Sequence, residues 1–150
     1  MRAVIQRVEK ASVVILENEV AKIEQGLLVL LGIEIEDAKE DTLWLASKIA
    51  ALRIFSDEKG VMNKSITELG GEVIVVSQFT LHAKTKKGNR PSYIKAARPE
   101  QAIALYQQFK EDLTLAIGRQ VQSGEFGAEM KVSLINDGPI TILIDTKNKE

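Results

Sequence analysis

The first third of the chain alternates apolar and polar residues. Residues 2–9 and 12–16 are rich in β-branched side chains and follow a period of two, which is typical of half-buried strands. Lys10-Ala11 lies between them, so we expect a tight connection there and a β-hairpin. A third strand is expected over 20–23, and the apolar run over 27–33, introduced by Gly26, predicts a buried central strand.

Two later segments repeat apolar residues at helical spacing instead. The first predicts a helix over about 38–52, with Asp37 and Glu40 spaced like a capping box at its start. Trp44, in this helix, is expected to be a core or interface residue. The second helix should begin at Pro99, which suits a first helical turn, and end at Gly118.

Short strands and turns account for the remainder. Residues 55–71 contain an acidic turn sequence and a Gly-Gly pair and are expected to form turns, whereas 73–76 predicts a short buried strand. Residues 130–135 and 140–144 predict two more strands, separated by 136–139. Eight or so strands with two main helices indicate an α+β fold with a mixed or antiparallel sheet. The length of 150 residues suggests one domain.

Composition narrows the cellular setting. Hydrophobic residues make up 45% of the chain and charged residues 27%, the balance of a globular protein, and there is no cysteine. The longest apolar run, 27–31, is far shorter than a membrane span, and the first residues lack the apolar block of a signal peptide. We therefore expect a cytoplasmic protein without disulfides and no association with membranes.

Positive charge is concentrated in one segment. The net charge is only −1, yet residues 77–99 contain no acidic side chain. The rest of the chain has 14 positive and 21 negative side chains, a net charge of −7. A basic segment on an acidic protein can attract a polyanion such as RNA, although a solvated loop is an equal alternative. The six cations are Lys84, Lys86, Lys87, Arg90, Lys95 and Arg98.

Few residues offer familiar catalytic chemistry. His82 is the single histidine, so a metal site built on several imidazoles is excluded and we expect no metal and no cofactor. A serine triad would need His82, but no nucleophile-elbow pattern occurs, so His82 is expected to be a polar loop residue. Ser92 and Lys95 match a Ser-x-x-Lys pattern, which is too short to be specific.

Two segments remain unusual. Ser77-Gln78-Phe79-Thr80-Leu81 puts polar side chains directly after an apolar strand, where hydroxyls can hold a water or an oxyanion, or simply satisfy the loop backbone. Asn136-Asp137-Gly138-Pro139-Ile140-Thr141 separates two apolar strands. Proline there requires a turn, an edge or a bulge, and a Gly-Pro bond can be cis. A plain hairpin turn is the simplest alternative.

Together these segments resemble the D-aminoacyl-tRNA deacylase family in its bacterial and eukaryotic form. Ser-Gln-x-Thr paired with Asn-x-Gly-Pro-x-Thr is specific to that family, and the similarity spans nearly the whole chain. The matching stretches are 1–14, Arg53-Ile54-Phe55 with Asp57 and Met62-Asn63, 77–81, 87–92, 124–130 and 136–141.

The resemblance implies a barrel-like core and a homodimer with its active sites at the interface. Gly138-Pro139, joined by a cis bond, would enter the partner's pocket and crowd the space of an L side chain. Selectivity would then be steric, and glycyl-tRNA should also be cleaved.

The same resemblance suggests how the ester bond of aminoacyl-tRNA is hydrolysed. Thr80 is a nucleophile candidate, but a threonine without a base is poorly activated, so the ribose 2′-hydroxyl is expected to assist. Ser77, Gln78, Phe79 and Thr80 would build the pocket, with covalent attack by Thr80 as the minor alternative.

Other residues have supporting roles in this hypothesis. Arg7 would hold the Gly-Pro loop and Met130 would line the pocket. Lys84, Lys86, Lys87 and Arg90 would bind tRNA. Two other functions remain open: an esterase with a threonine nucleophile, and an RNA-binding module without catalysis.

Overall fold

The computed structural model describes residues 1–150 and begins with a long hairpin. β1 (Arg2–Ile15) pairs antiparallel with β2 (Asn18–Ile23) and then with β3 (Gly26–Gly32). Leu16 and Glu17 form the turn, with φ of 47° and 65°, the left-handed values of a two-residue hairpin turn. The expected connection at Lys10-Ala11 is therefore wrong, because β1 continues through it. The strands expected over 20–23 and 27–33 are confirmed.

The opposite edge of β1 is occupied by β8 (Lys131–Asp145). Arg2 pairs with Asp145 and Val14 with Lys131, so both halves of β8 run in one direction along β1. Gln6 pairs with Thr141, whereas Val8 pairs with Asn136. The residues between these two positions form a bulge within β8, so the alternative of a hairpin turn is wrong.

The remaining strands extend the sheet from β3. β6 (Glu72–Ser77) lies parallel to β3, and the short β7 (Gln122–Ser123) lies parallel to β6. The strand order is β2-β1-β3-β6-β7, with β8 on the free edge of β1. The expected strand over 73–76 is confirmed, and the sheet is mixed.

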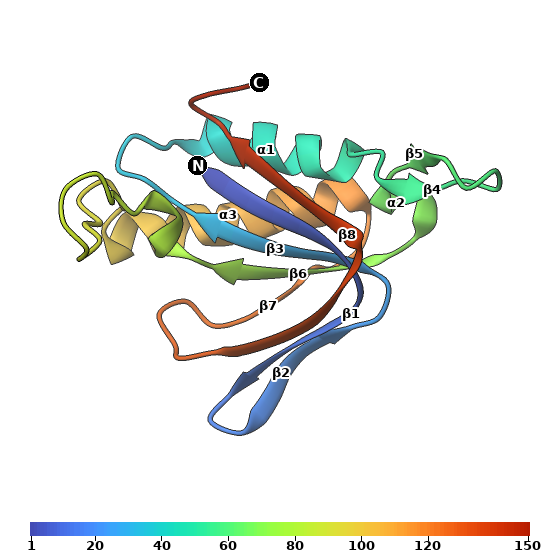
Figure 1. Ribbon diagram of the computed structural model, residues 1–150, viewed down its shortest axis with the longest axis horizontal. Helices are drawn as coiled ribbons and strands as arrows, with labels where there is room; N and C mark the ends of the chain where they lie inside the picture. The colour runs from blue at the N-terminus through green and yellow to red at the C-terminus, as the bar shows by residue number, and fades with distance from the viewer.

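Two long helices cover one face of this sheet. α1 (Lys39–Ala51) and α3 (Pro99–Ile117) run side by side (Figure 1), and both expected helices are confirmed. Gly118 ends α3 with φ of 69°. The cap of α1 differs from the expectation, because the Asp41 carboxylate accepts the backbone N–H of Ala38. The shorter elements are β4 (Phe55–Ser56), β5 (Met62–Lys64), α2 (Ile66–Leu69) and the 3₁₀ turn η1 (Phe79–His82).

Apolar side chains pack in two clusters, one on each side of the sheet. The larger cluster joins the sheet to α1 and α3 through residues such as Leu27, Val75 and Phe109. The smaller one contains Val13 and Ile74 and lies where β1, β2 and β8 curve away from the helices (Figure 1). The nearly closed sheet thus forms the expected α+β barrel-like core.

Ion pairs and hydrogen bonds also hold the two ends of the chain together. The buried Met1 ammonium donates to the buried Asp37 carboxylate and to the Thr146 hydroxyl. Asp37 thus pairs with Met1 instead of capping α1.

Trp44 is partly buried against the larger cluster, as expected. None of the helices is sufficiently long and apolar to span a membrane.

Candidate active site

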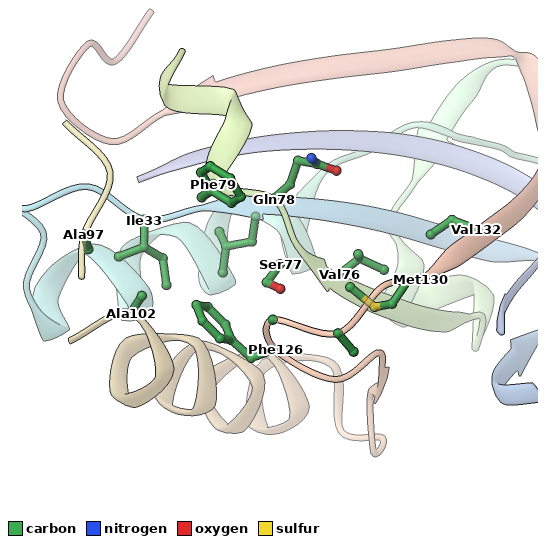
Figure 2. A pocket seen from close by; sticks show the side chains of 13 residues that line it. Ile33, Val76, Ser77, Gln78, Phe79, Ala97, Ala102, Phe126, Met130 and Val132 are labelled. Carbon is green, nitrogen blue, oxygen red and sulfur yellow. The ribbon is translucent and has the colours of Figure 1, made fainter. Parts of the chain in front are cut away.

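A cavity of about 290 Å³ opens where β6 ends. Its walls come from β3, β6, η1, the start of α3 and the segment before β8, and they contain no charged side chain (Figure 2). The lining residues are Leu31, Ile33, Val76, Ser77, Gln78, Phe79, Ala97, Ala102, Phe126, Gly127, Ala128, Met130 and Val132.

Ser77 and Gln78 provide the polar side chains of this cavity. Figure 2 shows the Ser77 hydroxyl pointing toward the side where Phe126 lies, while the Gln78 amide points to the other side of the chain. The backbone N–H of Gln78 donates to the Leu31 carbonyl at 2.7 Å, which continues the pairing of β6 with β3. The position of both side chains is thus fixed by the sheet.

Thr80 lies in η1, beyond the lining residues. Its hydroxyl accepts a hydrogen bond from the Gln78 side-chain amide, a group that cannot remove a proton. His82, two residues later, would share the face of Thr80 on a regular strand, but residues 79–82 form a 3₁₀ turn instead. His82 is buried, and its Nε2 atom has no hydrogen-bond partner, so the expectation of a polar loop residue is wrong.

An aromatic wall faces Ser77 across the cavity. The Phe126 ring packs on Tyr106 of α3, with 5.9 Å between ring centroids. The Tyr106 hydroxyl donates to the Val75 carbonyl at 2.9 Å, and burial raises its pKa to about 12, which keeps it protonated. The sequence did not indicate that Tyr106 supports this wall, because in the sequence it is one of several apolar residues along a helix.

Gly124 allows Met130 to approach the cavity. A Cβ atom on Gly124 would lie 2.3 Å from the Met130 sulfur atom, a distance at which the two atoms would overlap. Glycine at this position therefore leaves the space that the Met130 side chain occupies.

The bulge in β8 is held by Arg7 and Asn136. The Arg7 guanidinium donates to the Asp137 carbonyl at 3.2 Å and the Ile54 carbonyl at 2.7 Å, and it pairs with the Asp137 carboxylate at 3.1 Å. The Asn136 amide donates to the Ile140 carbonyl at 3.0 Å. The peptide bond between Gly138 and Pro139 is cis, and both residues are exposed.

The four basic residues expected to bind tRNA lie in an exposed loop between η1 and α3. Lys84 and Ser92 exchange backbone hydrogen bonds of 2.8 and 3.0 Å, which close the base of this loop. Lys84, Lys86, Lys87 and Arg90 do not line the cavity. No cluster of three or more His, Asp or Glu side chains could hold a metal ion.

A sequence model of the family described as "D-Tyr-tRNA(Tyr) deacylase" matches residues 4–145. The chain belongs to this deacylase family. Proteins named D-aminoacyl-tRNA deacylase from Bacteroides fragilis and Flavobacterium psychrophilum are each 63% identical over 150 residues, which is the full length of both chains compared. Membership in the deacylase family makes this chain an enzyme of the hydrolase class.

Solved structures show the same fold. The "c-Myc DNA Unwinding Element Binding Protein" is 40% identical, with a TM-score of 0.92 over 97% of this chain and 99% of the other. A "probable eukaryotic D-amino acid tRNA deacylase" has a TM-score of 0.81 at 17% identity over 95% of this chain and 97% of the other, which shows the fold alone.

The structure brings together only part of the expected deacylase site. Ser77, Gln78, Phe79 and Met130 line one cavity, and Thr80 contacts Gln78. The residues of the bulge and its arginine, together with the basic loop, lie outside that cavity. Most of the apolar lining was not identified from the sequence, because such residues look like ordinary core positions.

Proposed function

We propose that the chain hydrolyses the ester that joins a D-amino acid to the terminal ribose of transfer RNA. The observation that carries this proposal is the cavity built by Ser77, Gln78 and Phe79 in a chain that belongs to the deacylase family. An uncharged cavity suits the ester group and the adenosine, neither of which carries a charge. The basic loop gives the polyanionic RNA a place to bind outside it.

Catalysis in this proposal is assisted by the substrate itself. Water attacks the ester carbonyl carbon, the bond to the ribose oxygen breaks, and that oxygen takes up a proton. The Thr80 hydroxyl is hydrogen-bonded to the Gln78 amide, which is no base, and the single histidine, His82, is buried. We therefore assign that help to the neighbouring 2′-hydroxyl of the ribose, and assign Ser77, Gln78 and Thr80 to holding the ester and its water.

Substrate positioning falls to side chains around these groups. Phe79 and Met130 line the cavity and would contact the substrate. Lys84, Lys86, Lys87 and Arg90 would contact RNA phosphates, because they are exposed and no acidic residue lies in their segment.

Selectivity for D-amino acids is assigned to Gly138 and Pro139. Both are exposed and neither lines the cavity of its own chain, so they are free to reach the cavity of a second copy. Their backbone carbonyls would crowd the direction in which an L side chain points, whereas glycine would escape this exclusion. Arg7 supports the filter through its bonds to Asp137 and Ile54.

A homodimer follows from this assignment, because each site would need the bulge of its partner. Leu143, next to the bulge, is 66% exposed and Phe79 is 54% exposed, which gives a second copy apolar surface to cover.

We further propose that residues 1–150 act as one domain and work in the cytoplasm, where aminoacyl-tRNA is found.

A deacylation assay tests the proposed function. D-tyrosyl-tRNA, L-tyrosyl-tRNA and glycyl-tRNA are compared, each with a normal terminal adenosine and with one that lacks the 2′-hydroxyl. We expect release of D-tyrosine and glycine, no release of L-tyrosine, and a large loss without the 2′-hydroxyl. Undiminished hydrolysis without it would favour a threonine nucleophile, and binding without any hydrolysis would favour an RNA-binding module.

A further inference from the structure

An aromatic pair extends the site beyond the cavity. Phe79 lines the rim and is 54% exposed. The ring of Tyr93 packs against it edge to face, with 4.9 Å between centroids and 74° between planes. Tyr93 is not among the lining residues, so the pair reaches from the cavity toward the basic loop.

Tyr93 stands on a well-anchored part of that loop. Its carbonyl accepts the N–H of Ala96 at 2.9 Å, and the Lys95 carbonyl accepts the N–H of Ile35 at 3.0 Å. The bridge between Lys84 and Ser92 closes the loop directly before it. The ring is therefore held beside Phe79 by a fixed backbone.

The loop that carries Tyr93 is basic, although Glu34 and Glu36 line a hollow together with its Lys84 and Lys95. Lys84, Lys95 and Arg90 belong to a segment with no acidic side chain, and all three are exposed. Aromatic rings next to such cations are the arrangement by which proteins bind single-stranded nucleic acid, with bases stacked on rings and phosphates next to the charges.

We propose that Phe79 and Tyr93 form a stacking platform for the nucleotide that precedes the terminal adenosine of the substrate. The inference rests on the proposed function, since it assumes that the terminal adenosine enters the cavity. A cavity of about 290 Å³ accommodates one small ligand, so the preceding base lies outside it, where this pair is found. Stacking needs no base-specific hydrogen bond, so two aromatic rings are sufficient for such a platform.

The test compares two substrates of one reaction. D-Tyrosyl-tRNA has a preceding nucleotide, whereas the 3′-D-tyrosyl ester of adenosine has none. We expect Tyr93→Ala to raise the KM for D-tyrosyl-tRNA about tenfold, the size of one lost base stack, and to change that of the adenosine ester less than twofold. Tyr93→Phe keeps a ring and should restore most of the affinity. Ile94→Ala, at a neighbouring exposed residue, is the matched control.

Equal losses on both substrates would overturn the inference, because Tyr93 would then act only by supporting Phe79. The absence of any loss would overturn it as well. Equilibrium binding of a five-nucleotide RNA ending in adenosine, compared with adenosine alone, tests the platform without catalysis. If the wild-type protein binds the RNA through Tyr93 but cleaves neither ester, the proposed hydrolysis fails and the platform stands.

Discussion

Thr80 illustrates how a side chain's neighbours define its chemistry. Its hydroxyl accepts from the Gln78 amide, and the nearby His82 is buried in the turn with its Nε2 unpaired. The sequence predicted that Ser77, Gln78 and Phe79 would meet at a strand end, because that follows from an apolar strand changing to polar residues. It could not predict that residues 79–82 form a 3₁₀ turn, in which Thr80 and His82 lie on different faces. A sequence of this kind is compatible both with a continuing strand and with a turn.

Thr80→Ala is expected to lower kcat/KM on D-tyrosyl-tRNA by about tenfold or less. The hydroxyl would help to hold the ester, its water and the Gln78 amide without reacting itself, and one lost hydrogen bond of this kind costs about 1 kcal/mol. Loss of a covalent nucleophile would instead cost several orders of magnitude. Single-turnover kinetics measure the difference, and an acyl group trapped on Thr80 would contradict the expectation.

Gly138→Ala is expected to reduce activity on D-tyrosyl-tRNA at least tenfold. The φ of Gly138 is 127°, and a Cβ atom there would lie 2.9 Å from Ile140 Cγ1 and 3.3 Å from Arg7 Nη2. Such a backbone costs a non-glycine residue about 1–3 kcal/mol, so the bulge should shift. Hydrolysis of D- and L-tyrosyl-tRNA is measured together with urea unfolding.

Gly60→Ala provides the control for that change. Gly60 also has a positive φ, of 75°, but a Cβ atom added there would meet no other atom within 4 Å. This variant should lose stability without loss of activity at saturating substrate. Equal activity of both variants would show that the bulge does not contribute to the reaction.

At the scale of elements, local patterns were sufficient for the two long helices but not for strand pairing or for the short helix α2, which lies where turns were expected. The spacing of apolar residues and the terminal Pro99 and Gly118 predicted α3 correctly, because a helix satisfies its backbone locally. The hairpin turn was misplaced, since Leu16-Glu17 lacks the glycine or asparagine that usually marks a two-residue turn. That β8 pairs with β1 on both sides of the bulge depends on residues far apart in the chain, which no local pattern can report.

Tyr106→Phe is expected to destabilise the fold by about 1 kcal/mol, the usual contribution of one hydrogen bond. The hydroxyl links α3 to β6 at Val75, two residues before Ser77. The Gly124 N–H, 3.2 Å from the same carbonyl, would keep that acceptor satisfied, so the variant should fold. Urea unfolding measures the change, and an unchanged midpoint would contradict it. Tyr93→Phe serves as control, because its hydroxyl makes no hydrogen bond.

At the scale of the molecule, charge is divided between one basic loop and an acidic remainder. Replacing Lys84, Lys86, Lys87 and Arg90 together by alanine should weaken tRNA binding and flatten its salt dependence. Each phosphate contact releases counterions from the RNA, and the number of released ions sets the salt dependence, so fewer contacts give a smaller slope. Turnover of bound substrate should change little. Binding is measured over a range of salt concentrations, with Lys39 and Lys48 of α1 replaced in the control. An unchanged slope would show that the loop is only solvated.

A dimer in solution, about twice the chain mass of 16.6 kDa, is expected from sedimentation. Mixing Gly138→Ala with Gln78→Ala, each of which is expected to lose most of its activity on its own, gives a sharper test. In a mixed dimer, one site combines an intact cavity with the partner's intact bulge, so about a quarter of all sites should recover activity after random exchange. Activity in a monomer, or no recovery after exchange, would contradict the shared site.

The pairing of β1 with β8 has a consequence for biosynthesis. Every partner of β1 on this edge lies more than a hundred positions later in the chain. A ribosome synthesises about 5–20 residues per second, so the first strand leaves it several seconds before the last one. During those seconds the first strand exposes an unpaired edge, which invites pairing with another chain. The nascent protein therefore depends on its final segment, which covers that edge and contains the Gly138-Pro139 bulge. A translation product that ends before this segment would have an exposed edge and no bulge.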